Sequence, residues 1–201
     1  MSIKILNLTK NIDDRLLLND ISYEFLDNNF YVIKGDNGVG KTTFLYILAL
    51  LDNSYSGRIL IDGNDIKRLK KKDIKALRRN NISLLFSKGN LISYLTVKEN
   101  RTLFLNKNEP LILNNNINDT QNSNTLSGGE EILVALEREL SLNKKIILLD
   151  EVTASLDDSN LEILMNILTK LSKTHLIILV SHDPRTYTYG TLLEMKNGKL
   201  Q

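Results

Sequence analysis

The chain of 201 residues contains no cysteine. Disulfide bonds, thiolate chemistry and zinc sites built on sulfur are therefore excluded, as is common in a reducing compartment. It also has no apolar run near the ~20 residues that span a bilayer, and residues 1–10 show no leader-like apolar region. The formal net charge is only +2, so we expect no nucleic-acid partner. The composition predicts one cytoplasmic globular domain that serves any membrane process by docking onto another protein.

The most informative motif is a glycine-rich loop between a predicted strand and a predicted helix. Residues 35–42 read Gly-Asp-Asn-Gly-Val-Gly-Lys-Thr, which matches the phosphate-binding pattern G-x-x-x-x-G-K-[ST]. The apolar run 31–33 predicts the strand, and leucines at helical spacing predict a helix over 43–51. A chance glycine-rich turn would match this pattern in a chain of this length about one time in a hundred. We therefore predict a nucleotide-binding loop.

Such a loop binds phosphate with main-chain groups. Glycines let successive backbone N–H groups curl into one concavity at a helix N-terminus, where the helix dipole also favours an anion. We expect Lys41 to reach the outer phosphates and the Thr42 hydroxyl to bind Mg²⁺. The full set expected to bind ATP is Gly35, Asp36, Asn37, Gly38, Val39, Gly40, Lys41, Thr42 and Thr43.

The remaining segments indicate an α/β fold. Two continuously apolar runs flank a predicted helix and read as parallel strands covered on both faces. Other apolar segments read as antiparallel strands, and Asp62-Gly63 and Asn197-Gly198 mark hairpin turns. The basic stretch 67–79 reads as a helix with a solvated face, and the Asn-rich stretch 106–124 as a loop. The predicted strands are 3–8, 21–25, 58–61, 82–86, 146–149 and 176–180, and the predicted helices that follow the loop are 130–140 and 159–171.

Two acidic residues follow the apolar strand 146–149. Ligands of open α/β sheets bind at the carboxyl ends of strands, so Asp150 is expected to bind Mg²⁺ through water. Glu151 is expected to polarise the attacking water as general base. An acidic turn after a strand is common, and the upstream phosphate loop favours the functional interpretation. His182 ends strand 176–180 at the same edge and can donate to the γ-phosphate, whereas His175 reads as structural or exposed.

A second glycine pair opens the predicted helix 130–140. The run Leu126-Ser127-Gly128-Gly129-Glu130 makes an anion site at a helix start, with Ser127 as N-cap or phosphate donor. Alone it reads as a capped turn. Its place between the phosphate loop and the acidic strand gives it weight.

In this order the motifs resemble the nucleotide-binding domain of the ATP-binding-cassette (ABC) transporter family. The phosphate loop is followed by a signature at 126–130, the acidic strand, a D-loop at Ser155-Leu156-Asp157 and a switch histidine at His182. The resemblance implies a P-loop α/β fold with a mixed, mostly parallel central sheet, an antiparallel β-subdomain and a shortened helical lobe. It covers 1–201 as one domain, with a core of 1–80 and 141–201 and a lobe over about 81–140.

The resemblance also implies partners. Members pair head to tail, so Ser127, Gly128 and Gly129 are expected to contact the ATP held by the second subunit of a homodimer or heterodimer. The expected role is ATP hydrolysis at the inner face of the cell membrane, powering a separate integral membrane permease, in the first instance an exporter. A soluble ATPase with an assembly or regulatory role is the alternative. A module that holds ATP but hydrolyses it poorly is a third.

The chain departs from the family at several positions. Ile12 stands where an adenine-stacking aromatic is usual, so base stacking is either lost or supplied elsewhere, with Tyr55 or Tyr23 as the candidates. Ser87 stands where a metal-reaching glutamine is usual. The signature continues with Glu131 where the family is mostly polar and basic, and the segment before it is short by roughly one or two helices. The lobe and Ser87 favour the soluble alternative. Ser87 and Ile12 favour the module that hydrolyses ATP poorly, and intact Glu151 and His182 argue against it.

Overall fold

The computed structural model describes residues 1–103, 117–142, 144–154 and 156–201. Its strands form two sheets. The six-stranded sheet has the order β10-β9-β3-β8-β7-β6, in which β10 alone runs antiparallel to its neighbour. Its strands are β3 (Phe30–Lys34), β6 (Ile82–Phe86), β7 (Ile146–Asp150), β8 (Leu176–Val180), β9 (Thr191–Lys196) and β10 (Lys199–Leu200). The predicted mixed, mostly parallel sheet is therefore confirmed.

The second sheet is the antiparallel subdomain, with the order β2-β1-β4-β5. Its strands are β1 (Ile3–Ile12), β2 (Arg15–Phe25), β4 (Ser56–Ile61) and β5 (Asn64–Asp65). β1 and β2 run longer than predicted, because their pairing continues to the end of the hairpin, with Ile12 opposite Arg15. The hairpin at Asp62-Gly63 is confirmed, and both residues have the positive φ, 47° and 77°, that a tight two-residue turn requires.

Five α-helices connect the strands in the part of the chain that the structure describes. They are α1 (Lys41–Leu48), α2 (Lys71–Asn81), α3 (Val97–Thr102), α4 (Gly128–Leu140) and α5 (Asp158–Leu171). Short 3-10 turns occupy Ile66–Arg68, Ser123–Thr125 and Pro184–Thr186.

Two helix predictions need correction. The helix predicted over 43–51 begins at Lys41 and ends at Leu48, because Leu50 takes a left-handed backbone, φ 58°, that stops the helical hydrogen bonds. The stretch predicted as one basic helix over 67–79 divides into a 3-10 turn and α2, because Leu69 and Lys70 are extended. α2 has no buried residue, so its predicted solvated face is confirmed. Of the predicted loop 106–124, residues 106–116 lie outside the described residues.

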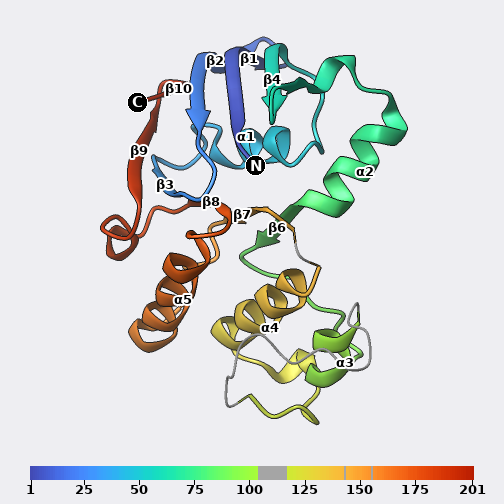
Figure 1. The fold of residues 1–201 in the computed structure, drawn as a ribbon. Coiled ribbons are helices and arrows are strands. Elements are labelled where there is room, and N and C mark those ends of the chain that lie inside the picture. Colours follow the sequence, from blue (N-terminus) through green and yellow to red (C-terminus); the bar gives the residue numbers. More distant parts are fainter. Residues whose placement is uncertain (104–116, 143, 155) are drawn as a thin grey trace.

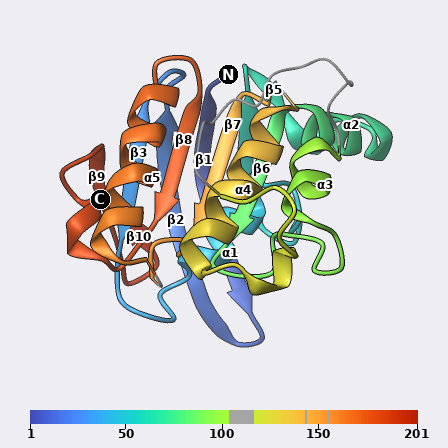
Figure 2. The same cartoon turned by 90° about the horizontal axis from the view of Figure 1, so that it is seen from below.

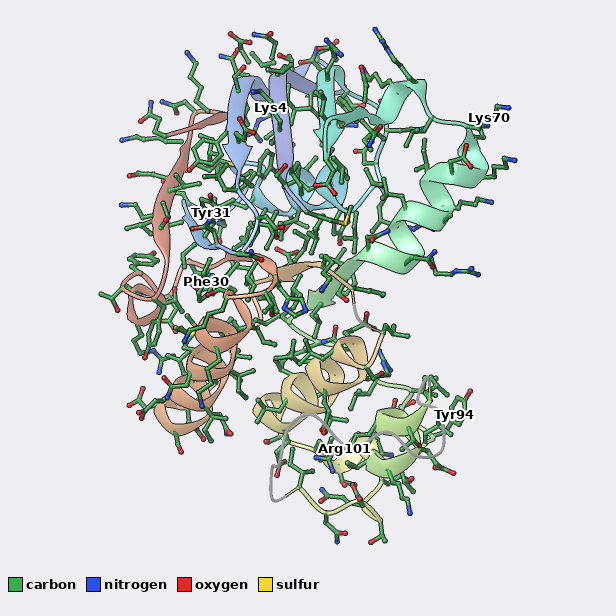
Figure 3. All side chains as sticks on the ribbon, in the orientation of Figure 1. Lys4, Phe30, Tyr31, Lys70, Tyr94 and Arg101 are labelled. Atoms are coloured by element: carbon green, nitrogen blue, oxygen red, sulfur yellow. The ribbon has the colours of Figure 1, made fainter. Side chains whose placement is uncertain are left out.

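The core has two layers, one on each face of the six-stranded sheet. On one face, α1 packs between this sheet and the antiparallel subdomain, with Phe44 and Leu48 fully buried. On the other face, α4 and α5 cover the sheet through residues such as Leu136 and Leu164 (Figures 1 and 2). Tyr31 belongs to the first layer and its neighbour Phe30 to the second, as the alternation of a strand requires (Figure 3). This layering places the carboxyl ends of β3, β7 and β8 side by side at one edge.

Candidate nucleotide-binding site

The glycine-rich loop leaves β3 and enters α1. Gly40 is the residue before the helix and has φ 105°, and a Cβ there would lie 2.8 Å from Leu18 Cδ2. Gly35 passes so close to β9 that a Cβ would lie 2.4 Å from the Met195 carbonyl oxygen. Only glycine fits both positions, because any side chain would push the loop away from its neighbours. The partly buried side chain of Val39 packs against the core.

Lys41 is buried within this loop. Its ammonium donates to the carbonyl oxygens of Gly35 at 2.7 Å and Asp36 at 3.0 Å. It also lies 3.5 Å from Oε1 of Glu151. The loop therefore holds one cation at its centre, beside the backbone groups that would face a phosphate.

The Thr42 hydroxyl donates to Oδ1 of Asp150 at 3.1 Å. The pKa of Asp150 is raised overall. Burial is the largest cause and the charge of Glu151 adds to it, whereas the Thr42 hydrogen bond and the charge of Lys41 lower the pKa. No group of three or more His, Cys, Asp or Glu within the described ranges is placed to hold a metal ion. A hydroxyl and one carboxylate suit Mg²⁺ all the same, because this ion takes few protein ligands and shares phosphate oxygens. A buried carboxylate with a raised pKa fits the binding of a cation there.

Glu151 follows β7 in a left-handed conformation, φ 52°, and its N–H donates to the Val180 carbonyl at 3.0 Å. Its Oε2 lies 2.7 Å from Nδ1 of His182 and accepts from the His182 backbone N–H at 3.3 Å. Glu151 thus links the buried Lys41 with the half-exposed His182. This bond fixes one ring nitrogen of His182 and leaves Nε2 for a second partner.

These groups line one cavity of about 370 Å³. The sequence predictions brought together here are the phosphate loop, Glu151 and His182, and Asp150 joins through Thr42. The cavity is lined by Leu17, Asn37, Gly38, Gly40, Lys41, Thr42, Thr43, Glu151 and His182. His175 lies elsewhere, after α5, where its Nδ1 contacts the Leu171 carbonyl at 3.1 Å.

The signature residues lie outside this cavity, at the start of α4. Ser127 caps the helix in a reciprocal pair with Glu130, which accepts from the Ser127 N–H at 2.8 Å. A Cβ on Gly129 would lie 2.9 Å from the side chain of Asn160, so α4 and α5 meet at their first turns. Ser127, Gly128 and Gly129 therefore do not join Lys41 within one chain, and their role toward a second copy stays a prediction. In the D-loop, Asp157 caps α5, and Ser155 lies outside the described residues.

The structure corrects the replacements expected for the adenine-stacking aromatic. Tyr23 packs against Phe25, with ring centroids 4.8 Å apart, and Lys67 lies over the ring of Tyr55 at 4.5 Å. Neither tyrosine lines the phosphate-loop cavity or the cavity beside it, because core packing and the Lys67 contact hold them elsewhere. Ile12 lines that neighbouring cavity and is 47% exposed, and Leu17 borders both.

Sequence reasoning missed a hydrogen-bonded cluster of Asn90, Glu131 and Arg138, called the polar brace below, beside the loop after β6 that contains Ser87. Asn90 bonds both backbone groups of Phe86, at 2.8 and 2.6 Å. The Asn90 N–H donates to Glu131 at 2.9 Å, and Arg138 donates to the Asn90 carbonyl at 2.6 Å. The unusual Glu131 after the signature was the available signal, since an acid on the inner side of a helix requires a partner.

Comparison with known proteins decides the family. The family model described as ABC transporter matches residues 18–154, more than half of the chain. The chain belongs to the ABC transporter family. As an ABC ATPase domain, it is 31% identical over 196 residues to the lipoprotein-releasing system ATP-binding protein LolD of Leptospira interrogans. That match covers 90% of this chain and 83% of LolD.

Other relatives of this ABC ATPase domain are longer. It is 32% identical over 209 residues to the macrolide export ATP-binding/permease protein MacB of Campylobacter jejuni and spans about a third of that protein's length. Among solved structures, it superposes on the dimeric bacterial ABC transporter cassette MJ0796 with a TM-score of 0.84 and 28% identity, covering 99% of this chain and 96% of that one. A second MJ0796 dimer is bound to ADP and Pi. Within the described ranges, no helix is both long and apolar enough to cross a bilayer.

Proposed function

We propose that this ABC ATPase domain binds Mg·ATP and hydrolyses it to drive a membrane-embedded transport component from the inner face of the membrane. The observation that carries the proposal is the linked set Lys41, Glu151 and His182 beside the Thr42–Asp150 pair. Relatives named for export and release, MacB and LolD, favour an exporter, although the methionine import protein MetN of Legionella pneumophila is 30% identical over 196 residues.

The chain's own residues account for the chemistry. Lys41 exchanges its bonds to the Gly35 and Asp36 carbonyls for bonds to phosphate oxygens, at little cost because the ammonium is already buried there. Thr42 and Asp150 would hold Mg²⁺, which neutralises charge on the phosphates when bound. Glu151, beside Lys41, accepts the proton of the water that attacks the γ-phosphorus. The bond to the ADP oxygen breaks. With Nδ1 donating to Glu151, His182 donates from Nε2 to the γ-phosphate as the imidazolium, in which both ring nitrogens carry a proton.

The proposal includes a second copy or a related domain. At the signature helix start, which lies apart from its own phosphate cavity, Ser127 is exposed and Gly128 is partly exposed, whereas Gly129 is buried. We propose that this helix start covers the ATP of the partner and that hydrolysis releases this bridge. The dimeric arrangement of the MJ0796 cassettes supports this part of the proposal.

We also propose where the membrane component docks. A groove of about 750 Å³ lies between α2, β6 and the end of α4. Its apolar surface comes from Ala49, Leu51, Ile82, Leu84 and Phe86, and its cations are Lys72, Lys75, Arg78, Arg79 and Lys144. Lys70, just before α2, points away from the body of the molecule (Figure 3) and does not line the groove. The acid of the groove, Glu139, is bound to Lys144 at 2.8 Å.

The charge of this surface selects its partner. Segment 67–79 holds eight Lys or Arg and one Asp, net +7, whereas the whole chain is +2. An acidic segment with apolar side chains complements both the cations and the apolar surface of the groove. The groove borders the proposed lobe of about 81–140, although β6 itself pairs with β7 in the six-stranded sheet.

The first experiment measures nucleotide binding. Fluorescent mant-ATP with Mg²⁺ is titrated into the wild type and Lys41→Ala, with phosphate release followed in parallel. We expect Lys41→Ala to weaken binding by about 100-fold, since a charge-assisted contact is lost. The matched control is Lys34→Ala, whose side chain pairs with Glu194 at 3.1 Å and lies outside the cavity. No affinity in the wild type, or full affinity in Lys41→Ala, would refute the proposal. Binding without phosphate release would select the poor-hydrolysis alternative.

The second experiment tests docking. The chain carrying Lys72→Glu, Lys75→Glu and Arg79→Glu should lose membrane proteins that co-purify with the wild type in mild detergent, while keeping its ATPase rate in isolation. The control carries Lys170→Glu, Lys173→Glu and Lys199→Glu, which are exposed and distant in the fold. Equal recovery by both triple variants would reject the groove. A wild type that purifies without a membrane partner and has ATPase activity would favour the alternative assembly or regulatory role. Ser87, in the loop that Asn90 holds through the backbone of Phe86, also favours that role.

A further inference from the structure

Three contacts join the two loops that follow the neighbouring strands β7 and β8. The loop after β7 carries Glu151, and the loop after β8 carries His182. Their side chains bond at the cavity, as described above. Beneath them, the buried hydroxyls of Thr153 and Ser181 lie 2.9 Å apart. The third junction, at the outer end, is made by Arg185, a residue that the sequence analysis did not single out.

Arg185 contacts both loops with one guanidinium group. Its Nε donates to the two carboxylate oxygens of Asp183 at 3.0 Å, and Nη2 reaches Oδ2 at 2.7 Å. Nη2 also donates to the Leu156 carbonyl at 3.2 Å, and Nη1 pairs with Asp158. The Arg185 hydrogen bonds hold the pKa of Asp183 below its usual range. Asp183 directly follows His182, and Leu156 and Asp158 flank the N-cap of α5.

The geometry points to Arg185 as a positioning residue that fastens the His182 loop to the start of α5. The planar fork suits this role, because one rigid group satisfies a carboxylate in two places and still reaches the other loop. The contact continues through Asn160 on α5 to Gly129 at the signature. Packed and hydrogen-bonded groups therefore form a continuous path from the signature to the His182 loop. This inference rests on the proposed roles of Glu151 and His182.

Replacing a residue with only a structural role would change stability, whereas we expect replacement of Arg185 to change turnover. Arg185 and Asp158 are 42% and 91% exposed, so their ion pair adds little to stability. We expect Arg185→Gln to leave the melting temperature and the mant-ATP affinity near wild type. Turnover should fall by about 10-fold, because His182 is no longer held in its productive position. Arg185→Lys, which keeps the charge without the fork, should give an intermediate rate. Arg58→Gln, at a 49% exposed arginine that pairs with Asp65 at 2.8 Å, is the matched control.

A double-mutant cycle separates positioning from general weakening. Since Arg185 acts through His182, Arg185→Gln should lower turnover much less in a His182→Ala background than in the wild type. Equal effects in both backgrounds would overturn the inference, as would unchanged turnover in Arg185→Gln. Asp158→Asn, at a 91% exposed site, should reproduce part of the loss. If His182→Ala and Glu151→Gln both leave turnover intact, the proposed function fails first, which is a distinguishable result.

A spectroscopic readout does not depend on activity. The chain has two histidines, His175 and His182, so labelled histidine gives two sets of ring ¹⁵N signals. Arg185→Gln should change the signals of His182, whose Nδ1 contact to Glu151 loosens, and leave those of His175 unchanged. His175 is an internal control because it bonds Leu171 and Thr174, away from Arg185. Unchanged His182 signals would contradict the coupling.

Discussion

Replacing Glu151 with glutamine removes one charge and keeps the shape of the side chain. The amide oxygen of the Glu151→Gln side chain can still accept from the His182 ring and N–H, which Glu151 contacts at 2.7 and 3.3 Å. The variant loses the 3.5 Å ion pair with Lys41, and Lys41 keeps its two carbonyl partners. Glutamate and glutamine meet the same strain at φ 52°. We therefore expect a folded protein that is less stable by about 1 kcal/mol.

The two functional effects have opposite signs. Loss of a general base typically costs about 10²–10⁴-fold, so turnover should fall by at least about 100-fold, or about 2.7 kcal/mol of barrier. Binding should tighten, because an anion beside the phosphates is gone. At about 5 Å and an effective dielectric of about 20, this repulsion is about 3 kcal/mol. The 22% exposure of the side chain reduces it, and at about 1 kcal/mol the affinity for Mg·ATP rises about fivefold.

Phosphate release under single-turnover conditions and a mant-ATP titration measure the two effects separately. Glu162→Gln, at an exposed position of α5, is the matched control and should match the wild type in both. Turnover of Glu151→Gln within about threefold of wild type would exclude Glu151 as the base. Weaker binding would show that the Lys41 contact organises the site more than its charge opposes ATP.

The remaining predictions concern the metal ligand, the loop and the brace. The pKa of Asp150 is raised by burial, so the folded state holds its proton to higher pH, and stability falls as pH rises from the unfolded value of 3.8 to the raised one. Asp150→Asn should thus raise the melting temperature at pH 7 by about 2–4 °C while abolishing Mg²⁺-dependent hydrolysis, and a lower melting temperature would contradict this. Gly40→Ala, at φ 105° and 2.8 Å from Leu18, should cost about 1–3 kcal/mol in denaturant unfolding and weaken ATP binding. Asn90→Ala removes two hydrogen bonds to Phe86 and should lower the free energy of unfolding in urea by about 1–3 kcal/mol. Asn53→Ala, at an exposed loop position, is the control and should leave that free energy unchanged. Equal losses in the two variants would show that the polar brace does not hold the loop.

Local patterns account for what could be predicted from the chain. The phosphate loop needs glycines in order beside one lysine, and the tight hairpins need residues that accept positive φ, as at Asp62-Gly63. Parallel strands end at one sheet edge, so the meeting of Thr42 with Asp150, 108 residues apart, followed from topology without knowledge of any side-chain packing.

Other features depended on partners that no local pattern names. α1 ends at Leu48 although apolar residues continue to Leu51, because the backbone turns at Leu50. From the sequence, Tyr23 and Tyr55 were candidates to stack on adenine. In the structure, Tyr23 packs against Phe25, and Lys67 lies over the ring of Tyr55. The brace of Asn90, Glu131 and Arg138 joins the loop after β6 to α4, with partners 41 and 48 residues apart.

The sequence by itself determined the family and its phosphate-binding motif, because such motifs are short and their spacing is set by backbone geometry. The magnesium ligand and the general base stay predictions. Only the tertiary structure decided how these parts are held. Arg185 and Asp158 lie 27 residues apart and meet through the packing of two strand ends on one helix, and Glu151 meets both Lys41 and His182 because β7 lies beside β8. Such contacts arise from three-dimensional closeness of groups that are distant along the chain, and periodicity and residue spacing do not encode it.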